Sequence, residues 1–518
     1  MDLRPPVFIG RNHFGIKGEA VQKAVAAITD GLEPPRRGFF VGDNLITWGK
    51  TLGWTRDKKF SDAFLKHVAD PVEKTIAWRT ATLLWAVRQS LLVPGDLVEC
   101  GCYKGATARI LYDAADLAAL DRKVYLYDLF EGAEGEAKHA MPGHGPDLAD
   151  AVRARFSDAP NVIVTKGRVP ETLANAPERI AFLHIDMNNA VAEVAALDLL
   201  FDRVSPGGVV VLDDYGWGYY AEQHDAEKAW FSERGYEVLE LPTAQALVVK
   251  APRGEARPLA RAGSTAWLEP GNRTESPVEL PQPLFIGPKH MGVASSAVST
   301  AVQAICEGMS SPKMGFFAGD NLITWGKALG WAQDSKFAAA FTAHAQGDAE
   351  KAMVWRTATL LWALRQSLGT LGDLVECGCS NSVTARILYD AADLRQTDRS
   401  LYLYDVFEGP EVSDRFADAP NVIVTRGPMP RTLENAPGRI AFLHIDMNNA
   451  AAEVAALDVL FDRVSPGGVV VLDDYGWIGH AAQHEAERAW FSARGYAVLE
   501  LPTGQGIVVK SPGAPQKA

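Results

Sequence analysis

The chain has 518 residues, of which 47% are hydrophobic and 22% charged, and its formal net charge is −13. This length predicts about two to four domains, and the composition is that of a soluble globular protein. The sequence has no apolar run of about 18 residues, no apolar secretory core at its N-terminus and no Lys/Arg cluster, so we expect a cytoplasmic protein that binds neither a membrane nor nucleic acid.

In chain order, roughly the first 90 residues show helical periodicity, as in AVQKAVAAITDGL and AWRTATLLWAVRQSLL, and are expected to form a helical cap. Short apolar segments then alternate with helical stretches such as 106–117 and 190–204. Strands that alternate with helices imply a mostly parallel sheet with helices on both faces. The predicted strands are Asp96–Gly101, Val124–Asp128, Asn161–Thr165, Ile180–Asp186, Gly208–Asp213, Glu237–Leu241 and Ala246–Lys250.

The whole pattern occurs twice. GDNLITWGK at Gly42–Lys50 returns unchanged at Gly319–Lys327, an offset of 277 residues. Further along the offset falls to 260, so the second copy lacks 17 residues between its equivalents of Gly132 and Phe156. A repeat this long indicates duplicated domains and not a solenoid. We predict a catalytic domain at 1–252, a linker rich in Pro, Gly and Ser at 253–282, a degenerate second domain at 283–510 and a tail at 511–518.

Glycines and acids follow the predicted strands, at the sheet edge where open parallel sheets bind their ligands. Glu99 ends the first strand, and Gly101, Tyr103 and Gly105 follow it. Glycines at this spacing let backbone approach a ligand at a helix N-terminus, although a plain strand–helix turn also explains them. Asp128 ends the second strand, where it can accept hydrogen bonds from ribose hydroxyls or cap the next helix.

Three carboxylates are predicted to gather where the fourth and fifth strands end. Asp186, Asp213 and Asp214 would repel one another there unless they are hydrated, protonated or bridged by a cation. Oxygen ligands alone suit a hard ion such as Mg²⁺. Helix caps and cofactor contacts without any metal are the alternative interpretation.

Together these motifs resemble the macrocin O-methyltransferase family and related bacterial sugar and polysaccharide methyltransferases. The resemblance runs from Leu83 to Lys250 and again from Leu360 to Lys510, and it rests on PGDLVECGCYKG, YDLFEG, LHID, SPGGVVVLDDYGW and LPTAQALVVK in that order. It implies two tandem Rossmann-like (class I methyltransferase) domains, each with a seven-stranded sheet. It also implies S-adenosylmethionine (SAM) as the methyl donor, often Mg²⁺, and a histidine base.

The resemblance assigns roles by matching motifs. The cofactor-binding residues are Glu99, Gly101, Tyr103, Gly105, Asp128 and Asp186. The metal ligands are Asp186, Asp213 and Asp214. The family carries a D-x-D-x-Y motif where this chain reads Asp186-Met187-Asn188-Asn189-Ala190, so we expect different substrate contacts and a different metal affinity.

Histidines supply the candidate bases. His139 and His144 lie in the loop 133–150 that corresponds to the loop carrying the family's proposed base, and the alignment favours His139. A histidine that titrates near neutral pH suits removal of a hydroxyl proton, while a solvated loop histidine is the alternative for each. The predicted catalytic set is therefore His139, His144 and Asp186. His184 is expected to be a partnered core histidine, and His224 either lines the pocket or is structural.

We expect the first half to methylate a sugar or another small-molecule hydroxyl by in-line displacement at the SAM methyl carbon. The second half is expected to be a pseudo-enzyme, because Ser382 replaces Gly105 and a side chain there should crowd the cofactor turn. We expect it to act as a built-in partner in an intramolecular pseudo-dimer, with a further homodimer left open. Two other classes also stay open: a nicotinamide-dependent sugar oxidoreductase and a non-catalytic scaffold of two decayed domains.

Overall fold

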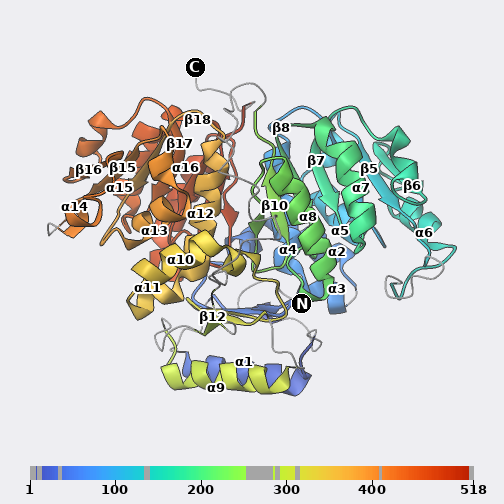
Figure 1. Cartoon of the computed structure of the whole chain (residues 1–518). Helices are drawn as coiled ribbons and strands as arrows, with labels where there is room; N and C mark the ends of the chain where they lie inside the picture. Colours follow the sequence, from blue (N-terminus) through green and yellow to red (C-terminus); the bar gives the residue numbers. More distant parts are fainter. Residues whose placement is uncertain are drawn as a thin grey trace, which may run out of the picture.

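The computed structural model describes residues 7–8, 15–32, 38–69, 71–132, 141–252, 280, 284–285, 292–309, 315–407 and 411–512. In these ranges two α/β lobes stand side by side, one from each half of the chain (Figure 1). Helices α1 (Gly18–Gly31) and α9 (Ser295–Gly308) lie together beneath them. The predicted linker and tail fall almost entirely outside the described residues.

Each lobe is built on seven strands. Those of the first lobe are β4 (Asp96–Cys100), β5 (Val124–Asp128), β6 (Val162–Lys166), β7 (Ile180–Ile185), β8 (Val204–Leu212), β9 (Leu239–Glu240) and β10 (Ala246–Val249). Those of the second are β14 (Asp373–Cys377), β15 (Leu401–Asp405), β16 (Val422–Arg426), β17 (Ile440–Ile445), β18 (Val464–Leu472), β19 (Leu499–Glu500) and β20 (Gly506–Val509).

The strand order is the same in both sheets: β6-β5-β4-β7-β8-β10-β9 in the first lobe and β16-β15-β14-β17-β18-β20-β19 in the second. The first five strands of each order run parallel, and the sixth is antiparallel to both of its neighbours. This confirms the predicted fold class of two tandem, mostly parallel α/β domains. The fifth strand is longer than predicted, because it begins at Val204 and the preceding helix has ended at Leu200.

Helices cover both faces of each sheet. In the first lobe, Leu97 and its alternate neighbours pack with the face that carries α2 (Lys58–His67), α4 (Ala77–Ser90) and α5 (Ala106–Ala114). Val98 points to the opposite face, with α7 (Ala190–Leu200) and α8 (Ala221–Glu233). The second-lobe counterparts are α10 (Ser335–His344), α12 (Val354–Leu368), α13 (Val383–Ala391), α15 (Ala450–Leu460) and α16 (Ala481–Ser492). The shorter helices are α3 (Pro71–Thr75), α6 (Leu148–Arg155), α11 (Asp348–Ala352) and α14 (Glu411–Arg415).

The predicted helical cap contains a β-hairpin. Strands β2 (Phe40–Gly42) and β3 (Leu45–Thr47) are joined by Asp43 and Asn44, both with φ of 55°, as a tight two-residue turn requires. The helical prediction missed it because each strand has only three residues, too few for a clear period of two. Helix α4 packs against β8, so it forms part of the sheet's own helical layer.

A third sheet joins the halves. Its order is β1-β2-β3-β13-β12-β11, with β1 (Val7–Phe8), β11 (Leu284–Phe285), β12 (Phe317–Gly319) and β13 (Leu322–Thr324). Its central pair is β3 and β13, which run antiparallel with Ile46 opposite Ile323. One hydrophobic cluster contains residues of this sheet together with α1 and α9, and the largest cluster also includes residues from both halves. None of the helices in the described ranges is long and apolar enough to span a bilayer.

Candidate functional site

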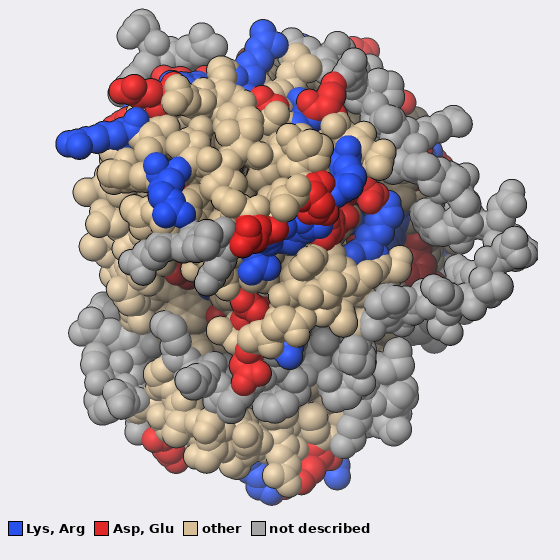
Figure 2. Space-filling view, turned by 60° about the vertical axis from the view of Figure 1, so that its left-hand side comes forward, with Lys and Arg blue, Asp and Glu red and all other residues tan. Residues whose placement is uncertain are grey.

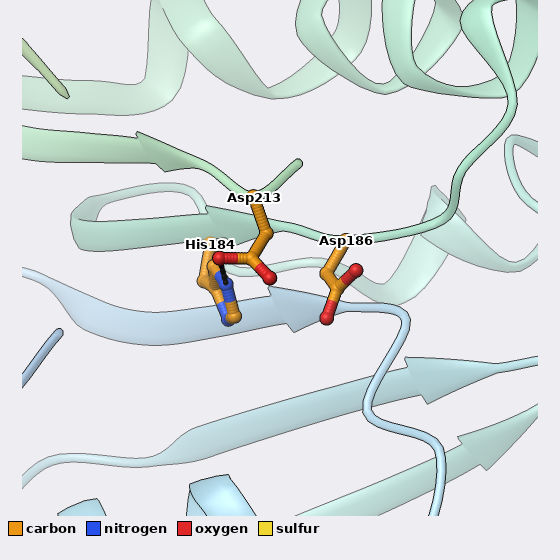
Figure 3. A group of neighbouring side chains, drawn as sticks. All are labelled: His184, Asp186 and Asp213. Atoms are coloured by element: carbon orange, nitrogen blue, oxygen red, sulfur yellow. Dashed lines mark ion pairs between the residues drawn. The ribbon is translucent and has the colours of Figure 1, made fainter. Parts of the chain in front are cut away.

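The carboxyl ends of β7 and β8 bring a histidine and two acids together. His184 lies on β7, Asp186 follows that strand, and Asp213 follows β8 (Figure 3). A potential ligand atom from each of the three lies within 4.8 Å of the others. Because Asp214 comes next in the chain, the three acids predicted from the sequence do end neighbouring strands. We refer to His184, Asp186, Asp213 and Asp214 as the carboxylate cluster.

His184 is held inside the cluster by two acids. Its Nδ1 lies 3.0 Å from Glu99 Oε1, and its Nε2 lies 4.0 Å from Asp213 Oδ1. Burial lowers the pKa of His184, but the nearby carboxylates of Asp213 and Glu99 outweigh burial and raise the pKa to about 10. His184 is therefore a buried, partnered and positively charged histidine, and Glu99 faces it.

Arg79 supplies the main positive charge of the cluster. It projects from α4, is 7% exposed, and donates hydrogen bonds to Asp213 Oδ2 and, over 2.5 Å, to Asp214 Oδ1. Its other terminal nitrogen lies 3.8 Å from Asp43 Oδ1. Sequence reasoning missed this residue. The available signal was an arginine inside the apolar helix AWRTATLLWAV, repeated as Arg356 in VWRTATLLWAL.

The position of Arg79 bears on whether the carboxylate cluster can bind the expected Mg²⁺. The predicted ligands were Asp186, Asp213 and Asp214, but the guanidinium already holds one oxygen of each of the last two. A divalent cation there would also meet the positive charges of Arg79 and His184 at close range. The residues do not fit an oxygen-only metal site, and the repulsion between the acids is relieved by the chain's own arginine.

The pKa values of the two acids that end the strands are shifted in opposite directions. Burial raises the pKa of Asp186 well above its usual range, and the negative charges of Asp213 and Asp214 raise it further. Burial also acts on Asp213, but the charge of Arg79 and the neighbouring His184 outweigh it and lower the pKa of Asp213 to about 2. Neighbouring carboxyl groups with pKa values pushed apart are typical of acid–base sites.

Residues 101–105, the glycine turn, are tied to the second strand by Asp128. One carboxylate oxygen of Asp128 accepts a hydrogen bond from the Tyr103 backbone over 2.6 Å, and the other accepts one from the Phe130 backbone over 2.6 Å. Gly101 has φ of +94°, and a side chain there would lie 1.8 Å from the Asp186 carbonyl oxygen. Close packing of β4 against β7 therefore already requires this glycine.

The second half keeps this turn with a serine. Ser382 adopts the left-handed conformation, with φ of +58°, that Gly105 adopts with φ of +67°. A side chain at Gly105 would contact Val152 and Phe156, each at 3.2 Å. A side chain at this position therefore meets its neighbours closely, and the predicted crowding of the cofactor turn by Ser382 stays a prediction. Ser382 is buried, and its left-handed backbone conformation costs a residue other than glycine about 1–2 kcal/mol.

The carboxylate cluster is itself repeated. His444, Asp446 and Asp473 form an equivalent group, and Arg356 donates hydrogen bonds to Asp473 and Asp474. The halves thus differ in the glycine turn and in the loop after the second strand, where the second copy is 17 residues shorter.

The candidate bases are only partly placed. His139 lies outside the described residues. His144 Nδ1 accepts a hydrogen bond from the Met141 backbone over 3.2 Å, and its ring meets the Tyr103 ring edge-on at 5.5 Å. Of the two loop histidines, His144 thus lies against the glycine turn. His224 packs on Tyr215 at 4.6 Å between ring centroids, in contact with the second half rather than in an open pocket.

A second buried pair of acids supports the loop after Asp186. Glu193 Oε1 accepts a hydrogen bond from the Met187 backbone over 2.9 Å, and Glu227 lies beside it. Burial raises the pKa of Glu193 to about 8, and it also raises the pKa of Glu227 well above its usual range. Sequence reasoning missed this pair as well, although Glu193 stands inside the apolar run AVAEVAALDLL.

On the face shown in Figure 2, Lys and Arg side chains lie interspersed with Asp and Glu. That face therefore does not present the uniformly basic surface on which a phosphate backbone binds.

Parts of both lobes are similar in sequence to known methyltransferases. Residues 85–229 match the family model of macrocin-O-methyltransferase, and residues 375–475 match that of a methyltransferase domain. A tetracenomycin rhamnosyl 4'-O-methyltransferase of Streptomyces olivaceus is 34% identical over 143 residues, covering 24% of this chain and 54% of the relative. Mycinamicin III 3''-O-methyltransferase of Micromonospora griseorubida is 30% identical over 144 residues, covering 24% and 56%. The chain spans about half the length of the curated relatives it matches.

Two solved structures align with parts of the chain. The O-methyltransferase NovP aligns with a TM-score of 0.30 and 20% identity, over 35% of this chain and 82% of its own. The calicheamicin methyltransferase CalS11 aligns with a TM-score of 0.29 and 18% identity, over 37% and 90%. The two lobes are therefore tandem α/β domains, the first similar over residues 85–229 to the macrocin O-methyltransferase family and the second similar over residues 375–475 to a methyltransferase domain.

Proposed function

We propose that the first half transfers a methyl group from SAM to a hydroxyl oxygen of a sugar-like small molecule. The observation that carries this proposal is the carboxylate cluster with Arg79, placed at the strand ends next to the glycine turn that Asp128 ties down. Support comes from the relatives, whose names describe O-methylation of a rhamnosyl-tetracenomycin and of mycinamicin III. The domain is taken as 1–252.

SAM would bind at the glycine turn, with Gly101, Tyr103 and Gly105 along its amino-acid part and Asp128 at its ribose. When bound, it supplies an activated methyl group on a positively charged sulfur. The acceptor oxygen forms its bond to the methyl carbon as the carbon–sulfur bond breaks, and the sulfur keeps the electron pair. The chain's main contribution would be to hold the three atoms in line.

The hydroxyl proton must leave during this step. His139 and His144 are the proposed bases, and of these the structure describes His144, next to Tyr103. Asp186 is the third candidate, because its raised pKa makes its ionised form a stronger proton acceptor than an ordinary carboxylate. Arg79 and His184 would stabilise negative charge on the acceptor oxygen, so the proposed reaction needs no divalent cation.

We propose that the second half does not catalyse the reaction. It repeats the carboxylate cluster, but it lacks the loop that carries His139 and His144. Its role would be structural, as the partner of the first half in an intramolecular pseudo-dimer. The reciprocal contacts across the third sheet support this role.

The matched variants Asp213→Asn and Asp473→Asn test the proposal. Transfer of labelled methyl from SAM to a panel of nucleotide-linked and macrolide-linked deoxysugars should fall by about 100-fold or more in Asp213→Asn, because a preorganised charge is lost. Asp473→Asn should stay within about twofold of the unaltered chain, since it changes only the second cluster. The rate should persist in excess EDTA. Equal losses in both variants would show that both halves catalyse. Inhibition by EDTA would show that the reaction requires a metal ion.

A further inference from the structure

The second half reaches the loop that follows the first half's acids. Just beyond β13, the Gly326 carbonyl accepts a hydrogen bond from the Gly218 backbone over 2.9 Å. Two residues later, the Ala328 backbone donates to the Gly216 carbonyl over 2.6 Å. These contacts lie two to four residues after Asp214, so the loop that begins with the first half's acids is paired with backbone of the second half.

Lys327 stands at the centre of this contact. It is 2% exposed, and its Nζ lies 3.7 Å from the centre of the Trp217 ring and 3.2 Å from the Asp43 carbonyl oxygen. Burial lowers the pKa of Lys327 to about 8, with the charge of Asp43 opposing the shift. The lysine thus lies buried between Trp217 and Asp43 of the first half.

The contact forms a chain that ends at the cluster. Lys327 donates to the Asp43 carbonyl oxygen, the Asp43 carboxylate lies 3.8 Å from Arg79, and Arg79 holds Asp213 and Asp214. The links made by Arg79 pair opposite charges with little access to solvent, where such pairs interact strongly. Lys327 fixes the Asp43 backbone, and its charge also acts on the Asp43 carboxylate. A change of charge at Lys327 should therefore alter how firmly Arg79 and the acid loop are held.

The equivalent contact is also made by the first half on the loop that follows the second half's acids. Lys50 of the first half lies over the Trp477 ring at 3.5 Å and donates to the Thr503 carbonyl over 3.1 Å. The Ile478 backbone donates to the Gly49 carbonyl over 2.9 Å. This reciprocity explains why GDNLITWGK is identical in the two halves, since each copy must fit the same surface of the other.

We infer that the two halves complete each other's carboxylate sites, with Lys327 as a positioning residue for the first half's acid loop and Lys50 for that of the second half. The catalytic consequence of this inference rests on the proposed function, but the positioning itself does not. Lys327 need not touch substrate or cofactor to act in this way.

The variants Lys327→Met and Lys50→Met in the full chain test the positioning by hydrogen–deuterium exchange. Lys327→Met should speed exchange of the backbone amides at 216–218 by about tenfold or more, and leave 476–478 unchanged, because local opening is set by local contacts. Lys50→Met should do the opposite. If either variant speeds both loops alike, or neither loop, the inference is overturned. Should the methionine variants not fold, Lys327→Gln and Lys50→Gln, which keep a donor, replace them.

A kinetic comparison separates this inference from the proposed function. With an accepted deoxysugar, Lys327→Met should lower kcat by about tenfold and leave the KM for SAM within about twofold, whereas Lys50→Met should change neither. Equal kcat losses in the two variants would show that the lysines only stabilise the fold, and this would contradict the positioning role of Lys327. If the unaltered chain shows no turnover while the exchange pattern is reciprocal, the proposed function fails and the positioning stands.

Discussion

Replacing Arg79 by methionine should cost about 3–5 kcal/mol of unfolding free energy at neutral pH, because it leaves buried carboxylates without their partner. Arg79 is buried against Asp213, Asp214 and Asp43, and burial alone would raise the pKa of an acid in such a place. Methionine fills a similar volume without charge, so the loss reports the charge and not a cavity. Urea unfolding followed by tryptophan fluorescence measures it.

Two further variants test why Arg79→Met should lower the free energy of unfolding. Arg79→Lys keeps a charge but cannot hold two carboxylates with one planar group, so it should fall between the original chain and methionine. Arg356→Met removes the equivalent arginine of the second half, and it should destabilise the chain by a similar amount while leaving methyl transfer intact. If Arg79→Met were as stable as the unaltered chain, the arginine would not be the cation that holds this cluster together.

The fragment 1–252 should not fold as a stable monomer. Without the second half, β3 loses its partner β13 and α1 loses its partner α9. Trp85 also loses the hydrogen bond that its ring nitrogen donates to the Ala497 carbonyl, and the largest hydrophobic cluster is divided. The exposed edge and apolar surface favour association. Size-exclusion chromatography and circular dichroism of the fragment test this expectation.

Adding residues 283–518 in trans should restore folding, because all the lost contacts come from that part of the chain. Any fragment 1–252 that folds alone should be a homodimer, because Gly42–Lys50 has the sequence of Gly319–Lys327 and can pair with a second copy of itself. A monomeric fragment with cooperative unfolding and full methyl transfer would contradict the role assigned to the second half.

Much of the fold could be predicted from the sequence, because apolar strands and their repeat are local signals. VVVL of β8 and LHI of β7 are buried on both faces, and such runs stand out in a sequence. The acids at the strand ends could be predicted too, since parallel strands bring their carboxyl ends to one edge.

The partners of those acids could not be predicted in the same way. Arg79 is separated from Asp213 by 134 residues, and Lys327 reaches Asp43 across 284 residues. The local hydrophobic periodicity of a sequence carries no information on which residues so far apart in the chain come into contact. The hairpin just before Lys327 has strands of three residues, too short to show a period of two, so neither the hairpin nor its contact with the opposite half is predictable from the sequence.

Calorimetric titration of the full chain with SAM tests the central claim most directly. We expect one SAM per chain, with a preference for the first half of at least tenfold, ~1.4 kcal/mol. Asp128→Ala should abolish this binding, because the carboxylate supports the glycine turn and faces the proposed ribose, while Asp405→Ala should leave it intact. Two equivalent sites per chain would contradict the assigned difference between the halves. If the chain bound no SAM, the alternative of a non-catalytic scaffold built from two methyltransferase folds would be favoured.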